Sequence, residues 1–281
     1  MNQANQQHEA DEPLIRKGKM FSEEFPSVSD ARPKNILCCS GGNDSVALIQ
    51  WAYENELSNV TVLFNDTGWA VDWWADRMVD ILRVCRKYKF KFSMTDSMGF
   101  KDLVRMKKAF PMAASKMSFC SEYLKKKPTR EWLKKYDPFH TATIYVGIRR
   151  CESQNRSNHP RSIIHDSEYK RPMEFPLVNF SDMDRDLMQE KTGIDILLHG
   201  SLECFPCVNS KRSDFRLLAK YPDRIDEVEE LEKEIAVMAK NGKERYMFRK
   251  YRHMGASGIR EVVKWGLCDQ GKYKAIAGPA R

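Results

Sequence analysis

The sequence predicts an α/β fold with a doubly wound, mostly parallel sheet, followed by a helical and basic C-terminal subdomain. The first half alternates short apolar runs, rich in β-branched residues, with stretches of helical periodicity. Continuous apolar strands are typical of a parallel sheet that helices cover on both faces. In the last quarter this alternation gives way to helical, charged stretches. We therefore expect three parts: a flexible tail (1–33), an α/β domain (34–220) and a helical subdomain (221–281).

The charge balance indicates anionic partners. Lysine and arginine total 47 against 39 acidic residues, a net charge of +8. Such a balance favours nucleotides or nucleic acid as ligands and says nothing about the fold. No apolar run approaches the roughly 18 residues of a membrane span, and no signal-peptide pattern begins the sequence. We therefore expect a cytoplasmic protein without a membrane partner, whose eight cysteines are thiols, metal ligands or catalytic groups.

The stretch around two adjacent glycines is the most informative. An apolar run at 36–39 stops at Ser40-Gly41-Gly42, and helical spacing begins at Val46. Two glycines let backbone N–H groups converge, and the helix adds its positive N-terminal end. The pattern predicts an anion cradle made mostly of backbone. It is neither a Walker A loop nor the dinucleotide fingerprint; an ordinary Gly-Gly turn between a strand and a helix is the alternative.

Further strands and helices follow in alternation. We expect strands at 60–64, 91–94 and 143–147, with a helix ending near Tyr88 between the first two. Ser181 is a suitable N-cap for a helix that reaches Lys191. The periodic stretch 223–241 predicts a packing helix without chemistry.

Polar residues follow two of these strands. Asp66-Thr67-Gly68 comes after the strand at 60–64, and Arg149 and Arg150 come after the strand at 143–147. In open α/β sheets ligands bind at the carboxyl ends of the strands. Arginines there offer bidentate donors to phosphate or sulfate. A plain turn and a solvated charge cluster are the respective alternatives.

Four motifs, in order over residues 34–215, resemble a known superfamily. Ser-Gly-Gly-Asn-Asp-Ser at 40–45 resembles the Ser-Gly-Gly-x-Asp-Ser signature of the PP-loop ATP pyrophosphatases. The Asp-Thr-Gly turn, Cys120 before a basic Lys-x-x-Pro helix, and Gly-Ile-Arg-Arg-x-Glu-Ser…Arg at 147–156 resemble phosphoadenosine phosphosulfate (PAPS) reductases. The resemblance implies the adenine nucleotide alpha-hydrolase-like fold.

The resemblance also implies a function. It implies ATP or a related adenine nucleotide with Mg²⁺, adenylation of an acceptor, and displacement of AMP by sulfur or nitrogen in nucleotide or nucleic-acid modification. The catalytic residues it implies are Asp44, which helps to place Mg²⁺, Arg149 and Arg150. The nucleotide-binding set it implies is Ser40, Gly41, Gly42, Asn43, Asp44, Ser45, Asp66, Thr67, Gly68, Gly147, Arg149 and Arg156. Asn43 replaces the lysine that is common in the family, so Mg²⁺ or an arginine would have to supply that charge.

The pair Cys204-Phe-Pro-Cys207 predicts a metal site. A C-x-x-C turn points two sulfurs at one centre in zinc and iron–sulfur sites. We expect Cys120 and Cys268 as the other two ligands, with Cys151 as a weaker substitute, around a [4Fe-4S] cluster or Zn²⁺. Uncoordinated thiols are the alternative. For a sulfur-transferring enzyme, a sulfur donor such as a cysteine desulfurase is an expected partner.

The C-terminal stretch 243–281 mixes basic and aromatic residues. Such a mixture suits a DNA or RNA surface, and equally an ordinary basic subdomain. Two other functions stay open: PAPS reduction, and a nucleotide-sensing, DNA-associated module without turnover. Two observations argue against PAPS reduction. The Glu-Cys-Gly-Leu-His segment of PAPS reductases is missing, and Cys268 is the only thiol in the last 70 or so residues.

Overall fold

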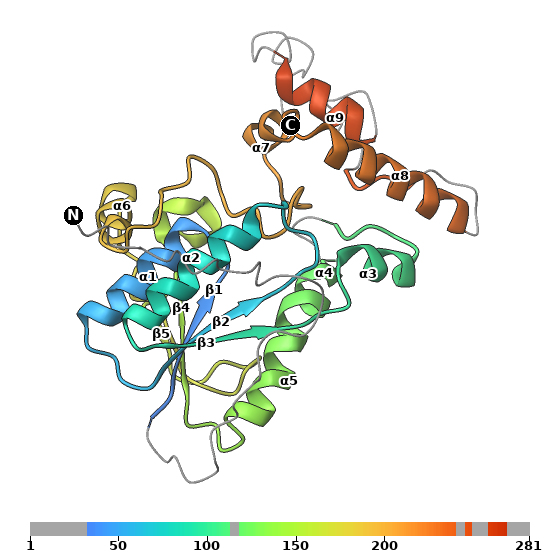
Figure 1. The fold of residues 1–281 in the computed structure, drawn as a ribbon. Coiled ribbons are helices and arrows are strands. Elements are labelled where there is room, and N and C mark those ends of the chain that lie inside the picture. The colour runs from blue at the N-terminus through green and yellow to red at the C-terminus, as the bar shows by residue number, and fades with distance from the viewer. Residues whose placement is uncertain (1–32, 113–117, 240–244, 249–257, 269–281) are drawn as a thin grey trace, which may run out of the picture.

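A computed structural model describes residues 33–112, 118–239, 245–248 and 258–268. The chain forms a six-stranded sheet. Figure 1 shows helices on both faces of the sheet and a further group of helices, α7, α8 and α9, beside it. The strand order is β3-β2-β1-β4-β6-β5, and all neighbours are parallel except β5 and β6. The strands are β1 (Asn35–Cys39), β2 (Val60–Asn65), β3 (Lys91–Thr95), β4 (Thr143–Val146), β5 (Ser162–Ile163) and β6 (Met173–Glu174).

The helices confirm the predicted alternation in the first half of the chain. Those around the sheet are α1 (Asn43–Glu54), α2 (Trp74–Lys87), α3 (Phe100–Lys107), α4 (Phe119–Ser121), the π-helix η1 (Glu122–Lys126), α5 (Lys127–Tyr136), the 3₁₀ turns η2 (Arg150–Glu152) and η3 (Gln154–Arg156), and α6 (Asp182–Glu190). The remaining helices are α7 (Arg212–Leu218), α8 (Pro222–Met238) and α9 (Ile259–Leu267). Ser181 caps α6 as predicted, because its hydroxyl accepts a hydrogen bond from the Asp184 N–H.

Helices bury the sheet from both sides, which explains the unbroken apolar strands. Leu37 and Val62 pack under α1 and α2, whereas Ile36 and Leu63 face α5. Successive residues of each strand therefore enter opposite cores. The doubly wound α/β fold predicted from the sequence is confirmed.

The direction of winding reverses between β1 and β4. From β1 the chain proceeds to β2 and β3 on one side, and it then returns to place β4 on the other side of β1. Loops that leave the carboxyl ends of two such strands separate and leave a crevice between them. The glycine loop follows β1 and the arginine segment follows β4, so both border this crevice.

The helices α7, α8 and α9 form a group that shares one apolar core with the sheet domain. Phe215, Val228 and Ile259 belong to the same buried cluster as Trp69 and Phe100. Ion pairs between α3 and α8 add to this contact, with Lys101 Nζ 2.6 Å from Glu227 Oε1. The group begins at α7, ahead of the boundary at 220/221 predicted from the sequence.

Two predictions lie wholly or largely outside the described residues. These are the flexible tail, of which only position 33 is described, and most of the basic aromatic stretch 243–281. In the described part of the stretch 243–281, Phe248 is buried and packs edge-on against Phe215 with ring centroids 4.8 Å apart. That ring serves the core and is not a surface on which bases could stack. Among the described helices, none is both long and apolar enough to span a membrane.

Candidate functional site

The glycine loop forms an open anion cradle. Gly41 has a positive φ of 75°, and no side chain caps the N-terminus of α1. The N–H of Gly41 is bonded to the Cys39 sulfur. In the part of the chain that the structure describes, the N–H groups of Asn43 and Asp44 have no acceptor. Two free N–H groups at the positive end of a 12-residue helix are an arrangement that suits an anionic group such as phosphate.

The end of β4 closes against this loop at Gly147. A Cβ atom there would lie 2.7 Å from the Asp44 carbonyl oxygen and 3.0 Å from its carbonyl carbon. Real Cβ atoms do not approach backbone so closely, and both atoms here belong to the main chain. Only glycine allows β4 and the loop to meet at this distance.

Arg149 binds the acidic groups beside the cradle. It is 3% exposed, its Nε donates to Asp44 Oδ1, and its Nη2 lies 3.0 Å from Asp182 Oδ1. Burial alone would lower the pKa of Arg149, but the hydrogen bond and charge of Asp44 raise it. For Asp44, burial raises the pKa of the carboxyl group and Arg149 opposes that shift. Arg149 thus fixes Asp44 in place, and the second carboxylate oxygen of Asp44 has no hydrogen bond to any described residue.

The other two predicted arginines lie differently. Arg150 directs its Nε and Nη2 to the His159 carbonyl (2.9 and 2.7 Å) and its Nη1 to Asn179 Oδ1 (2.8 Å). Its guanidinium therefore supports the neighbouring loops. Arg156 pairs with Glu152 and is 43% exposed, so part of its guanidinium faces solvent.

The Asp-Thr-Gly turn joins the end of β2 to a distant segment. Asp66 Oδ1 accepts the N–H of Gly68 at 2.8 Å, and the buried Thr67 hydroxyl donates to the Glu203 carbonyl at 2.6 Å. Trp69 forms an isolated parallel bridge with Cys204. The turn thus anchors the segment that carries the C-x-x-C pair.

The structure gathers three cysteines beside the ion pair of Lys125 with the buried Glu203. Cys204 shares a hydrogen bond with Cys207. The pKa of Cys120 is raised mainly by burial and, to a lesser extent, by the charge of Cys207. The hydrogen bond from Cys204 lowers the pKa of Cys207 to about 6, and the N–H of Asn209 and the charge of Lys125 act in the same direction. Lys125 lies 3.1 Å from the carboxylate of Glu203, whose side chain is 5% exposed. These contacts favour the thiolate form of Cys207.

Cys268, the fourth predicted ligand, lies at the end of α9, where its carbonyl oxygen accepts a hydrogen bond from Arg212. Nowhere in the described ranges are three or more His, Cys, Asp or Glu side chains placed so that they could hold a metal ion. The exposed Cys151 contacts Arg149 and the Phe180 carbonyl instead. A thiolate beside a lysine suits a cysteine-bound metal, but the four-cysteine arrangement is not assembled here, and the centre stays a prediction.

The family profile of the phosphoadenosine phosphosulfate reductase domain matches residues 34–199, which is more than half of the chain. The chain belongs to this family. The matched range begins just before β1 and ends just before Ser201. The PP-loop and PAPS reductase-like resemblance derived from the motifs is thus confirmed.

Individual relatives of this PAPS reductase-domain protein are distant. An uncharacterised 37.8 kDa protein from the gpa 5′ region of Escherichia phage 186 is 26% identical, with 74% of this chain and 77% of the relative covered. Among solved structures, a PAPS reductase from Candida auris in complex with phosphate has 13% identity and a TM-score of 0.43 over 59% of this chain and 76% of that one. The U34-tRNA thiolase NcsA from Methanococcus maripaludis, with its [4Fe-4S] cluster, has 14% identity and a TM-score of 0.41 over 70% and 67%. The family assignment rests on the sequence match alone.

Two side chains hold the loop of this PAPS reductase-domain protein, and the sequence analysis missed one of them, Arg77. The side-chain amide of Asn43, a predicted nucleotide-binding residue, exchanges two hydrogen bonds with the backbone of Leu197 (2.8 and 3.0 Å), so that side chain is not free for phosphate. Arg77 of α2 is buried and donates to the Gly41 carbonyl at 2.6 Å and the Asp195 carbonyl at 3.0 Å. An arginine on the apolar face of a helix was the available signal, because such a position must find internal acceptors.

Proposed function

We propose that this protein is a PP-loop enzyme that uses ATP to adenylate an acceptor and then transfers sulfur to it. The observation that supports this most is the physical link between the anion cradle and the cysteines. Ser201 donates to the Ser40 carbonyl at 3.0 Å, and its Cβ lies 3.1 Å from where a Gly42 Cβ would stand. Cys204 and Cys207 follow within six residues. One short segment thus connects the nucleotide loop and a thiolate.

In this proposal the cradle holds the pyrophosphate part of ATP. The free N–H groups of Asn43 and Asp44 bind phosphate oxygens, and the Asp44 carboxylate is a ligand for Mg²⁺, a hard cation that prefers oxygen. Mg²⁺ would supply the charge that the absent lysine at position 43 does not. The acceptor oxygen attacks the α-phosphate and releases pyrophosphate. A sulfur nucleophile then displaces AMP.

In the second step of the proposed reaction, the cysteines take part in sulfur transfer to the acceptor. Cys207 has the lowered pKa that a sulfur nucleophile or a metal-bound thiolate needs. The half-exposed Lys125 lies 3.1 Å from the buried carboxylate of Glu203, so the charge of that carboxylate is balanced. A persulfide-bearing protein such as a cysteine desulfurase is the proposed sulfur donor, and a nucleotide or nucleic acid is the proposed acceptor.

Two other functions compete with this proposal. PAPS reduction fits the family and would give sulfite from PAPS. A nucleotide sensor would bind ATP without turnover. Release of pyrophosphate from ATP that requires an acceptor would separate the proposed enzyme from both.

The nucleotide part is tested by a loop variant and a matched control. Gly42→Val would press a branched side chain against Ser201 and into the cradle, whereas Gly200→Ala adds a methyl group with no atom within 4 Å. Because the cradle binds through charge-assisted hydrogen bonds, we expect ATP affinity measured by calorimetry to fall at least tenfold in Gly42→Val only. Unchanged ATP binding in a folded Gly42→Val protein would contradict the loop assignment.

A further inference from the structure

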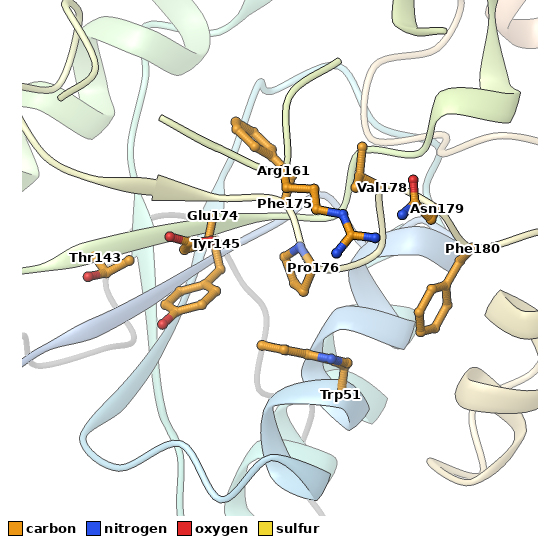
Figure 2. Close-up of a pocket in the computed structure, with 10 residues that line it drawn as sticks. All are labelled: Trp51, Thr143, Tyr145, Arg161, Glu174, Phe175, Pro176, Val178, Asn179 and Phe180. Carbon is orange, nitrogen blue, oxygen red and sulfur yellow. The ribbon is translucent and has the colours of Figure 1, made fainter. Parts of the chain in front are cut away.

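A second cavity lies away from the glycine loop. It has a volume of about 560 Å³ and opens between α1, the neighbouring strands β4 and β6, and the loop that follows β6 (Figure 2). Trp51, on α1, stands eight residues after Asn43. At about 1.5 Å of rise per residue, this places it about 12 Å further along the helix than the cradle. The Trp51 end of the cavity therefore lies away from the cradle, while Asn179 at its other end contacts Arg150.

The winding of the fold explains why this cavity exists. Helices α1 and α2 cover one face of the central strands, and α6 packs against α1. Tyr145 of β4 and Glu174 of β6 are paired on this face, are only partly buried, and line the cavity. The loop with Pro176 and Phe180 forms the remaining wall.

Aromatic rings line this cavity. The Trp51 and Tyr145 rings are 6.0 Å apart at 39°, and both are only partly buried. Pro176 and Phe180 add flat apolar surface (Figure 2). Rings arranged in this way offer stacking surfaces to a planar ligand.

Polar groups of both kinds face the same space without partners. Neither the Arg161 guanidinium nor the Glu174 carboxylate makes a hydrogen bond or ion pair with any part of the chain that the structure describes. Burial raises the pKa of the Tyr145 phenol, and the charge of the nearby Glu174 raises it further. The Asn179 side-chain oxygen accepts from Arg150, and no described residue accepts a hydrogen bond from its NH₂ group. A cation, a carboxylate and an amide donor around aromatic rings are thus available to a ligand with matching groups.

We propose that this cavity binds a nucleotide unit with a guanine base. The base stacks on Trp51 and Tyr145, and its adjacent ring and amino N–H groups donate to Glu174. Guanine offers that pair of donors, whereas adenine offers only its amino group on the same edge. Arg161 pairs with the phosphate as a fork-shaped donor. A free guanine nucleotide and a guanine within a single strand share this chemistry.

The test is calorimetry on the full chain with a nonhydrolysable ATP analogue present, which keeps the glycine loop occupied. The probes are GMP, AMP, a hexamer of thymidine nucleotides and the same hexamer with one guanine. We expect GMP to bind at least fivefold more tightly than AMP. Glu174→Gln should remove this preference, and Arg161→Gln should weaken GMP binding at least fivefold. These two side chains have no partners in the described structure, so the fold should survive both changes.

Two controls fix the location of the site. Arg83→Gln removes an exposed surface arginine of α2 and should leave GMP binding unchanged. Gly42→Val should also leave it unchanged, because the cradle is a different site. If the guanine hexamer binds at least tenfold more tightly than both GMP and the all-thymidine hexamer, the ligand is a strand; otherwise it is a free nucleotide. Equal affinities for GMP and AMP, no measurable GMP or guanine-hexamer binding, or binding that Arg161→Gln leaves intact would overturn the proposal.

Discussion

Single residues decide how the cradle is built and held. Gly147 lets β4 meet the loop, and Arg77 fixes the Gly41 carbonyl from the opposite side. Arg149 fixes Asp44. None of these contacts depends on a bound ligand, so the cradle is preorganised and little reorganisation is needed when an anion binds.

At the same scale, Cys207 is expected to react as a thiolate at mildly acidic pH. Its pKa is lowered to about 6, first by the hydrogen bond from Cys204. The rate of alkylation by iodoacetamide should therefore rise through pH 6 and level off above pH 7. Replacing Cys204 by Ala removes the largest cause, so the midpoint should move up by about one pH unit or more. Mass spectrometry of the modified peptide gives the rate at this residue.

The exposed Cys151, read from the same digests, serves as the internal control. Its alkylation should not change in Cys204→Ala. A Cys207 profile that is identical in the wild type and in Cys204→Ala would show that the pair does not interact as described.

At the scale of elements, one carboxylate of α8 holds two other segments. Glu232 is 4% exposed, and it accepts the N–H of Met247 at 2.9 Å and the N–H of Ile259, the first residue of α9, at 3.1 Å. Burial raises the pKa of Glu232 to about 7, and the charge of Glu229 adds to this shift. Helix α8 therefore holds Met247 and the start of α9 through a carboxyl group that titrates near neutral pH.

The sign of the resulting pH dependence follows from the raised pKa. Protonation is favoured in the folded state, so the contribution of Glu232 to stability is fully present below pH 4.5 and is lost as the pH rises through about 7. Between pH 5.5 and pH 8 the wild type should lose about 2 kcal/mol more of unfolding free energy than Glu232→Gln, which cannot ionise. Urea unfolding at the two pH values measures this difference.

Glu230→Gln, which changes an exposed carboxylate of the same helix, is the control and should follow the wild type. If Glu232→Gln and the wild type lose equal stability over this pH range, Glu232 does not titrate as inferred.

At the scale of the whole molecule, membership in the PAPS reductase domain family does not make the chain a PAPS reductase. The sequence lacks a Glu-Cys-Gly-Leu-His segment. We therefore expect no sulfite when PAPS and a thioredoxin system are supplied to the full chain. A colorimetric sulfite assay, with a working PAPS reductase as positive control, makes the measurement.

Sulfite production that disappears in Cys268→Ser would contradict this prediction and make PAPS reduction the favoured function. Production that survives in Cys268→Ser but is lost in Cys207→Ser would assign the reaction to the C-x-x-C pair instead.

The sequence by itself determined the fold class and the position of the cradle. Both depend on local patterns: unbroken apolar strands, helical periodicity, and Gly41-Gly42 between a strand and a helix. The polar residues at strand ends were also predictable, because parallel strands bring their carboxyl ends to one edge. The two-residue strands β5 and β6 were not predicted, since so short a segment has no periodicity to read.

Only the tertiary structure decided which side chains meet. Arg149 and Arg150 are neighbours with equal chemistry, yet one binds Asp44 and the other binds the His159 carbonyl, because successive residues at a strand end point in different directions. The approach of Cys120 to Cys207, the capture of Asn43 by Leu197 and the cavity beside Trp51 likewise join residues far apart in the chain. Such contacts depend on how elements pack in three dimensions, and no local pattern in the sequence encodes that packing.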